Sequence, residues 1–293
     1  MLRRDAIAVL LGACRAIRAT GAGALDAYME SAAGAALLID VRARRLIGAH
    51  NPTLAGESLL PPGSTLKPFA LAALMDAGKL RAEESFPCPG KLTIAGHSLD
   101  CAHPRLAEAM RVRTSIAYSC NCYVARMAAR LDSGELARAL GRDGFRSPTG
   151  LLGPREVAGH LRNAAPPDAT RLQALGEEGV AITLAELALA YRQLALRVND
   201  APRLRPVLEG LEDAVAYGTA QRARIPGVVV AGKTGSVRTS AGVPLAWFAG
   251  FVPSRAPEVV VAVVLQGYSG GADAAPAAGR ILEAWRAGKL LAG

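Results

Sequence analysis

The chain has 293 residues, of which 51% are hydrophobic and 4% aromatic, and its formal net charge is +9. This length allows one large domain or two small ones with a sizeable core, and the absence of any run of about eighteen apolar residues argues against a transmembrane helix. The charge favours an anionic neighbour such as a cell-wall polymer or a membrane surface, but scattered arginines and few aromatics argue against nucleic acid.

Residues 1–24 resemble an export signal. Two arginines at positions 3 and 4 precede the apolar stretch 6–13, which is the order of charged and hydrophobic regions in signal peptides. The arginine pair is similar to a twin-arginine signal, and residues 11–14 resemble a lipobox ending at Cys14. We therefore expect a periplasmic protein, or one on the outer face of the cytoplasmic membrane, with Cys14 as the candidate lipid anchor. An ordinary amphipathic helix is the alternative.

The next predicted elements are a short helix, a β-hairpin and a longer helix. Residues 24–32 suit the short helix. Residues 34–41 are an apolar run typical of a buried strand, and residues 46–50 return as a second strand after a charged turn. The longer helix is predicted from Ser64 to about Ala77.

Residues 81–217 are predicted to be an inserted helical subdomain, because alanine and leucine dominate and β-branched runs are scarce. Apolar stripes at helical spacing predict helices at 114–131 and 183–196. Residues 141–170 are rich in Gly and Pro and read as a loop. Residues 88–101 read as a small hairpin between two cysteines.

The sheet is predicted to resume at Ile225. Strands are expected at 227–238, 244–252 and 258–266, joined by connections so short that neighbouring strands must be antiparallel. A final helix is predicted from Asp273, its N-cap, to Leu290. With the first hairpin these strands make a five-stranded antiparallel sheet, so we expect an α/β (α+β) fold. The sheet subdomain would comprise residues 25–80 and 218–293.

The cysteines and histidines indicate no metal site and no cofactor. No Cys-x-x-Cys pair or Cys/His set has zinc-ligand spacing among Cys14, Cys88, Cys101, Cys120, Cys122, His50, His97, His103 and His160. A disulfide between Cys88 and Cys101 fits an oxidising compartment, and two unpaired cysteines are the alternative. Cys120 and Cys122 read as buried small hydrophobes, and no histidine is assigned a role.

Ser64 and Lys67 carry the first chemical signal. Residues three apart on a helix share a face, so the hydroxyl and the amine can lie side by side. Serine needs an adjacent base to act as a nucleophile. A lysine in a dry pocket can be that base, because burial favours its neutral form. Taken alone, the pair is better explained by a helix-capping serine and a solvated lysine.

Two further motifs follow in order. They are Ser119-Cys120-Asn121 in the helical region and Lys233-Thr234-Gly235-Ser236 on a predicted strand. The three motifs together match the signature of penicillin-binding proteins and class A β-lactamases. From about residue 30 onward the chain resembles a penicillin-binding protein transpeptidase domain. Cys120 stands where the common pattern has aspartate, and Ser236 replaces the more frequent threonine.

The resemblance implies a role for each matching residue. Ser64 would attack the carbonyl of a D-Ala-D-Ala peptide, with Lys67 as general base. Ser119 would bridge Lys67 and Lys233 and pass a proton to the leaving amine. The expected substrate-binding residues are Asn121 for an amide, Lys233, Thr234 and Ser236 for the terminal carboxylate, and Gly235, whose missing side chain would let a substrate strand approach. The backbone N–H groups of Ser64 and Ser236 would form the oxyanion hole, and Lys233 would help keep Lys67 neutral.

The function implied is a penicillin-binding serine D,D-peptidase, either transpeptidase or carboxypeptidase, with peptidoglycan stem peptides and β-lactams as partners. One alternative is a serine β-lactamase, which needs a glutamate-held water. Glu156 is the only nearby candidate, and its setting resembles a structural Glu-x-x-Gly segment. The other alternative is a non-catalytic penicillin-sensing or wall-binding domain. No glycosyltransferase region is recognised before the domain, which favours a small accessory enzyme or a stand-alone domain.

Overall fold

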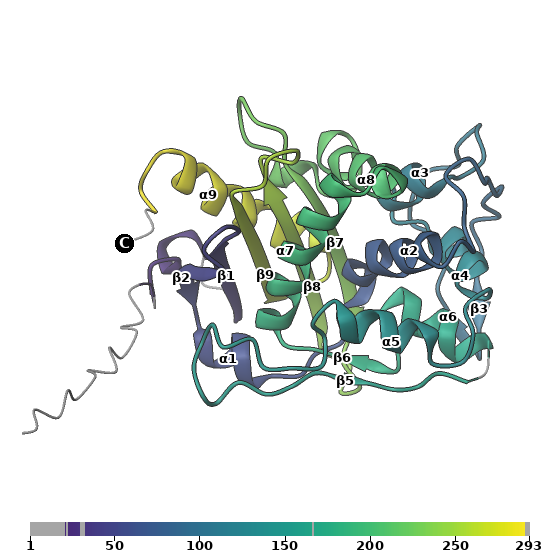
Figure 1. Cartoon of the computed structure of the whole chain (residues 1–293), viewed down its shortest axis with the longest axis horizontal. Helices are drawn as coiled ribbons and strands as arrows, with labels where there is room; N and C mark the ends of the chain where they lie inside the picture. The colour runs from purple at the N-terminus through teal and green to yellow at the C-terminus, as the bar shows by residue number, and fades with distance from the viewer. Residues whose placement is uncertain (1–20, 22, 30–32, 166, 291–293) are drawn as a thin grey trace, which may run out of the picture.

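The computed structural model describes residues 21, 23–29, 33–165 and 167–290 (Figure 1). Cys14 and most of the predicted export signal lie outside the described residues, so the export and anchoring expectations stay predictions. Within the described part of the chain, no helix is both long enough and apolar enough to span a bilayer.

A five-stranded antiparallel sheet in the order β2-β1-β9-β8-β7 forms the centre of the molecule. Its strands are β1 (Gly34–Asp40), β2 (Arg45–His50), β7 (Ala231–Arg238), β8 (Pro244–Val252) and β9 (Val259–Gln266). In Figure 1 the purple β1 lies beside β9, so segments from the two ends of the chain build one sheet. The predicted fold class is confirmed, and β7 is an edge strand.

The segment between β2 and β7 carries most of the helices. The helices are α1 (Pro52–Glu57), α2 (Lys67–Asp76), α3 (Val112–Ala117), α4 (Asn121–Ala128), α5 (Glu135–Arg142), α6 (Pro167–Leu175), α7 (Leu184–Asp200), α8 (Arg205–Ala216) and α9 (Ala275–Arg286). Two small hairpins accompany them, β3 (Thr93–Ile94) with β4 (His97–Ser98) and β5 (His160–Leu161) with β6 (Val180–Ala181). The first of these is the hairpin expected between Cys88 and Cys101.

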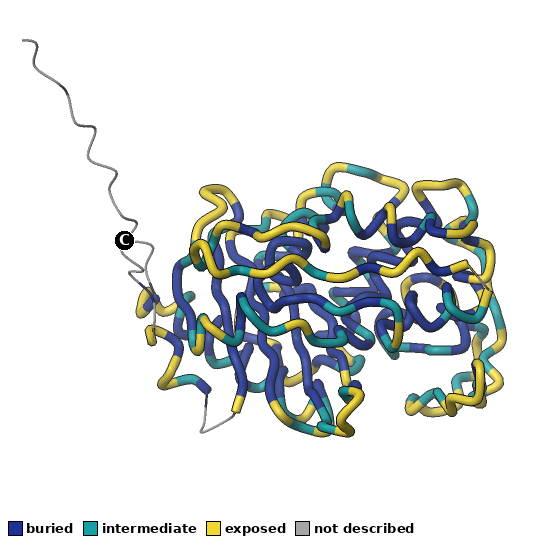
Figure 2. The backbone as a smooth tube through the Cα atoms, turned by 90° about the horizontal axis from the view of Figure 1, so that it is seen from below, coloured by how far each residue is buried: buried dark blue, intermediate teal, exposed yellow. Residues whose placement is uncertain are grey.

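The two faces of the sheet bury different side chains because successive residues of a strand point to opposite sides. On β8, Trp247 and Phe251 join the core shared with α2 and α7, whereas Phe248 and Val252 join the core under α9. Figure 2 shows these central strands as dark blue, buried backbone, with exposed segments confined to the periphery. The edge strand β7 contacts α8 and the turn that contains Ser64.

The helix predicted at 114–131 is broken, and the break lies at the middle motif. α3 ends at Ala117 and α4 begins at Asn121, while Ser119 between them has φ +57° and Cys120 is extended. The apolar stripe carried no signal for this break. Its cause is tertiary, because the Ser119 carbonyl and hydroxyl both accept hydrogen bonds from Lys67.

Other predicted boundaries also shift. The strand expected from 227 begins only at Ala231, because Gly227, with φ +72°, makes a turn first. Asp273 does not cap the last helix: its carboxylate accepts from the backbone N–H groups of Tyr268 and Ser269, and the helix proper begins at Ala275. The helix expected at 24–32 is a single 3₁₀ turn, Asp26–Tyr28, within the described residues. The loop expected at 141–170 contains β5 and the start of α6.

Candidate active site

Ser64 lies in a 3₁₀ turn, Gly63–Leu66, that leads directly into α2. Gly63 has φ +54°, a conformation that glycine adopts without steric cost, and its N–H donates to Gly176 O at 3.0 Å. The Thr65 hydroxyl donates back to Pro62 O at 2.8 Å and closes the turn. The sequence Pro62-Gly63 therefore fixes the entry to the helix and leaves the half-buried Ser64 facing a cleft.

Lys67 is fully buried beneath Ser64, and its amine binds the middle motif. Nζ donates to Ser119 O at 2.7 Å, to Ser119 Oγ at 3.0 Å, and to Asn121 Oδ1. No hydrogen bond joins Ser64 Oγ to Lys67 Nζ among the bonds found in the described residues. The first two motifs are thus in direct contact, and the serine hydroxyl remains free to turn toward a ligand.

The burial of Lys67 favours its neutral form. Burial lowers the pKa of Lys67 from 10.5 to about 8, against the opposing effect of the nearby acidic groups of Cys120, Cys101 and Glu177. Burial also lowers the pKa of Lys233, with Lys67 as the lesser cause. Desolvation, rather than the charge of Lys233, is therefore the main reason that the neutral form of Lys67 is favoured.

The third motif lies on the edge strand β7. Lys233 is fully buried and donates to Thr234 O at 2.9 Å, while the Thr234 and Thr219 hydroxyls are 2.8 Å apart. The Ser236 hydroxyl is exposed and accepts from Gly270 N–H at 3.0 Å. Within the described residues, no hydrogen bond joins Ser119 to Lys233. The expected bridge between the two lysines through Ser119 is formed on the Lys67 side alone.

Gly235 serves the protein's own packing, which differs from the sequence-based expectation. A Cβ at this position would lie 2.8 Å from Pro62 O and 3.1 Å from Thr65 Cγ2. The missing side chain lets β7 pass against the Ser64 turn, rather than leaving room for a substrate strand. This close approach is what brings Ser236 near Ser64, although the two residues are far apart in the sequence.

Both ends of the Asn121 amide have protein partners. Its Oδ1 accepts from Lys67, and its Nδ2 donates to Leu99 O at 2.9 Å with a longer contact of 3.5 Å to Asp100 O. Asn121 therefore ties the lysine to the chain that follows the β3–β4 hairpin.

A cleft of about 810 Å³ contains the groups that these elements present. Five predicted site residues line it, namely Ser64, Ser119, Asn121, Thr234 and Ser236. Lys67 and Lys233 lie beneath its surface. The sequence reading gave no role to Tyr118 and Tyr217, whose rings flank the cleft with centroids 5.7 Å apart, nor to His103 and Thr219.

Glu156 is placed away from this cleft. Its carboxylate accepts from the backbone N–H groups of Thr149, Gly150 and Leu152, so it closes the loop in which it lies. It is not among the residues that line the cleft. This agrees with the structural interpretation of its Glu-x-x-Gly setting.

One group of side chains in the described residues has the chemistry to hold a metal ion. Cys88, Cys101, His103 and Cys120 bring their ligand atoms within 4.8 Å of one another. The Cys88 and Cys101 sulfurs are 3.6 Å apart and both cysteines are free, so the disulfide considered from the sequence is not formed, since an S–S bond is about 2.05 Å long. The sequence patterns predicted no metal site and did not reveal this cluster.

The family model for the penicillin binding protein transpeptidase domain matches residues 49–283. The chain belongs to this family. The match includes all three motifs and the whole cleft.

Two similar relatives carry names that fit the transpeptidase domain family. The chain is 30% identical over 252 residues to a probable peptidoglycan D,D-transpeptidase, PbpC, of Pseudomonas aeruginosa, covering 73% of this chain and 44% of that protein. It is 28% identical over 275 residues to the peptidoglycan D,D-transpeptidase PbpA of Mycobacterium tuberculosis, covering 76% of this chain and 54% of the relative. The chain thus spans about half the length of the curated relatives it matches.

The same architecture is found in a solved structure. Pseudomonas aeruginosa PBP2 in complex with WCK 5153 superposes with a TM-score of 0.78 at 21% identity, over 89% of this chain and 76% of that one. At this level of identity the likeness shows the transpeptidase-domain fold alone.

Proposed function

We propose that this transpeptidase-domain protein is an exported serine D,D-peptidase that forms an acyl-enzyme at Ser64 with D-Ala-D-Ala stem peptides and with β-lactams. The observation that carries the proposal is the buried Lys67 amine, held by Ser119 and Asn121 directly below the cleft that Ser64 lines. The names of the relatives support transfer to an amine acceptor, and hydrolysis by water is the carboxypeptidase variant of the same chemistry. The proposal includes a location in the periplasm or on the outer face of the cytoplasmic membrane, with Cys14 as the candidate lipid anchor.

In the acylation step, Ser64 Oγ bonds to the carbonyl carbon of the penultimate D-alanine while neutral Lys67 takes its proton. Catalytic hydrogen bonds commonly tighten only when substrate is bound, so the Ser64–Lys67 contact would close at this stage. The Ser119 hydroxyl, 3.0 Å from Lys67 Nζ, would pass the proton to the nitrogen of the departing D-alanine as the C–N bond breaks. An amine or water then attacks the ester and gives a proton to Lys67, which passes it to Ser64 Oγ as the ester C–O bond breaks.

The edge strand would orient the substrate. The Thr234 and Ser236 hydroxyls line the cleft and would receive the terminal carboxylate, whose negative charge favours the protonated form of Lys233 beneath them. Asn121 would contact a substrate amide. The backbone N–H groups of Ser64 and Ser236 would stabilise the oxyanion, and loss of one such donor typically costs about 10²–10³ in rate.

The decisive experiment is intact-protein mass spectrometry after incubation with penicillin. We expect one penicilloyl adduct per chain, absent from Ser64→Ala, and release of D-alanine from a pentapeptide. An adduct that persists in Ser64→Ala refutes the nucleophile. Rapid loss of the adduct with penicillin turnover would instead identify a β-lactamase, and an adduct without D-alanine release would favour a penicillin-sensing domain.

Acylation is expected to depend on pH through Lys67. A general base must be neutral, and the neutral fraction falls about tenfold per unit below the pKa. With the pKa of Lys67 at about 8, the second-order acylation rate should rise from pH 6 and level off above pH 8. Stopped-flow measurement with a chromogenic β-lactam checks this profile. A rate that is flat between pH 6 and 8 would contradict the assignment of Lys67.

A further inference from the structure

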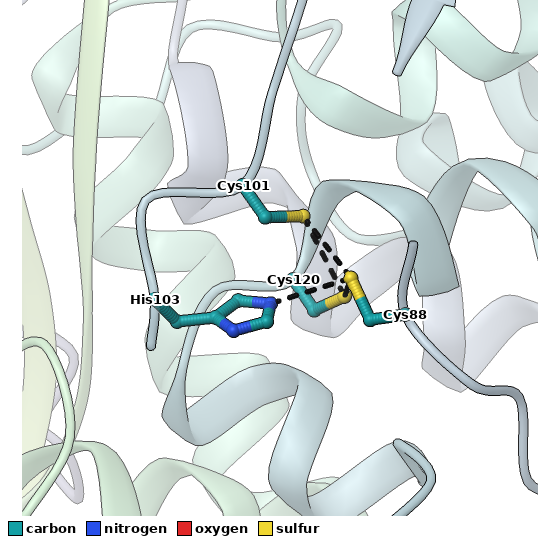
Figure 3. Close-up of side chains that lie close together, drawn as sticks. All are labelled: Cys88, Cys101, His103 and Cys120. Carbon is teal, nitrogen blue, oxygen red and sulfur yellow. Dashed lines mark hydrogen bonds between the residues drawn. The ribbon is translucent and has the colours of Figure 1, made fainter. Parts of the chain in front are cut away.

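Three thiols and one imidazole converge beside the cleft from separate parts of the sequence (Figure 3). Cys88 precedes the β3–β4 hairpin, Cys101 and His103 follow it, and Cys120 immediately precedes α4. In Figure 3 the four side chains point toward one central position. Cys120 is buried and the other three are partly buried, so the four side chains form an interior cluster and not a group of exposed residues.

Four of the six distances between the ligand atoms are close to those in a zinc tetrahedron, and all six are within 4.8 Å. The sulfur pairs Cys88–Cys120, Cys88–Cys101 and Cys101–Cys120 are 3.5, 3.6 and 3.8 Å apart. A zinc ion with bonds of about 2.3 Å to sulfur and about 2.0–2.1 Å to nitrogen separates its ligand atoms by about 3.8 Å (S–S) and about 3.6 Å (S–N). The distance from Cys88 Sγ to His103 Nε2 is 3.6 Å.

The surroundings of the ligands are also suited to a metal. His103 Nδ1 lies 2.8 Å from Pro104 O and donates to it, which leaves the Nε2 lone pair directed at the sulfurs. A histidine that binds metal nearly always donates its other ring N–H in this way. Backbone N–H groups of Gly90 and Tyr123 donate to the sulfurs of Cys88 and Cys120, both at 3.4 Å, and such bonds favour the thiolate form that a metal requires.

From this geometry we propose that Cys88, Cys101, His103 and Cys120 form a tetrahedral zinc site. Three thiolates and an imidazole make a closed Cys₃His set, which is typical of structural zinc, and soft sulfur ligands exclude magnesium and calcium. Cys122 lies outside the set. Its Sγ is 3.6 Å from Cys101 Sγ and 3.5 Å from Lys91 O, to which it donates.

The zinc ion would fasten the chain around the hairpin to the middle catalytic motif. Cys120 stands between Ser119 and Asn121 in the sequence, and Asn121 binds the carbonyls of Leu99 and Asp100, next to Cys101. His103 and Asp100 line the cleft itself. The metal would therefore fix both the position of Ser119 below Ser64 and one wall of the cleft.

The test is the metal content of the full chain, purified reduced and without a metal-binding tag. We expect about one zinc per chain and, after exchange for cobalt(II), the intense visible bands of a tetrahedral thiolate-bound ion. Cys88→Ser and His103→Ala should each lose these bands or bind the ion at least tenfold more weakly. Cys122→Ser is the matched control, with the same chemical change in the neighbouring thiol, and should keep both zinc and bands.

Any of three results would overturn the site. The wild-type chain could take up neither zinc nor cobalt, or its intact mass could be lower by two hydrogens for each disulfide among these cysteines. Alternatively, Cys122→Ser could lose metal while His103→Ala retains it. Removal of zinc should also slow penicillin acylation about 10- to 100-fold. That last readout depends on the proposed function, whereas the metal content and the cobalt spectrum do not, so the two hypotheses can fail separately.

Discussion

Replacement of Lys67 by alanine is expected to slow acylation of Ser64 by penicillin by about 10²–10⁴-fold, the range for loss of a positioned general base. Lys67 is the amine beneath Ser64 whose pKa burial lowers to about 8, so about half of it is neutral at pH 8, and it also binds Ser119. The variant would lose both proton acceptance and the placement of the relay. Stopped-flow acylation of the purified variant measures the effect, with circular dichroism to verify folding.

Lys79→Ala is the matched control. Lys79 lies just beyond the end of α2 and pairs with Asp132 at 2.9 Å and Glu135 at 2.6 Å, away from the cleft. The Lys79→Ala variant loses the same type of side chain from the same region, and its Ser64 should be acylated at the wild-type rate. Equal rates for Lys67→Ala and the wild type would remove Lys67 from the mechanism.

Replacement of Gly176 by alanine should destabilise the protein by about 2–5 kcal/mol and impair acylation. Gly176 has φ +76°, and a Cβ there would lie 2.1 Å from Gly63 O and 2.8 Å from Gly63 N. Both neighbours are backbone atoms in the turn that carries Ser64, so relief requires the nucleophile itself to move. Denaturant unfolding and the acylation rate, measured on one preparation, record the two effects.

Gly150→Ala separates conformational strain from this steric contact. Gly150 has the same φ of +76°, but nothing lies within 4 Å of its Cβ position. We expect a loss of about 1–2 kcal/mol from the left-handed backbone alone, with unchanged acylation. If the two alanine variants had the same free energy of unfolding and the same acylation rate, the close contact between Gly176 and the Ser64 turn would not contribute to either.

The parts of the fold that the sequence predicted well are those set by local pattern. The strands 244–252 and 258–266 are continuous apolar runs, and the structure has β8 and β9 within one residue of those bounds. The helix entry near Ser64 was predicted to within three residues, because Pro62-Gly63 marks it by backbone preferences alone. The combination of motifs also indicated the family that the comparison shows.

The features that the sequence missed depend on contacts between distant segments. The break at Ser119 exists because Lys67 binds both the carbonyl and the hydroxyl of that residue. The apolar pattern of residues 114–131 cannot predict a hydrogen bond to a distant residue. Asp273 looked like a helix cap, but the preceding turn, Tyr268–Ser269, uses its carboxylate. The cysteine–histidine cluster escaped detection because its members are spaced 13, 2 and 17 residues apart, and only the fold brings them together.

The left-handed backbone of Ser119 places stability and activity in opposition at a single residue. Its φ of +57° costs an L-residue about 1–3 kcal/mol, and glycine would adopt the same conformation without strain. Glycine would, however, remove the hydroxyl that lies 3.0 Å from Lys67. Replacement of Ser119 by glycine would therefore relieve the backbone strain and at the same time abolish the proposed proton relay.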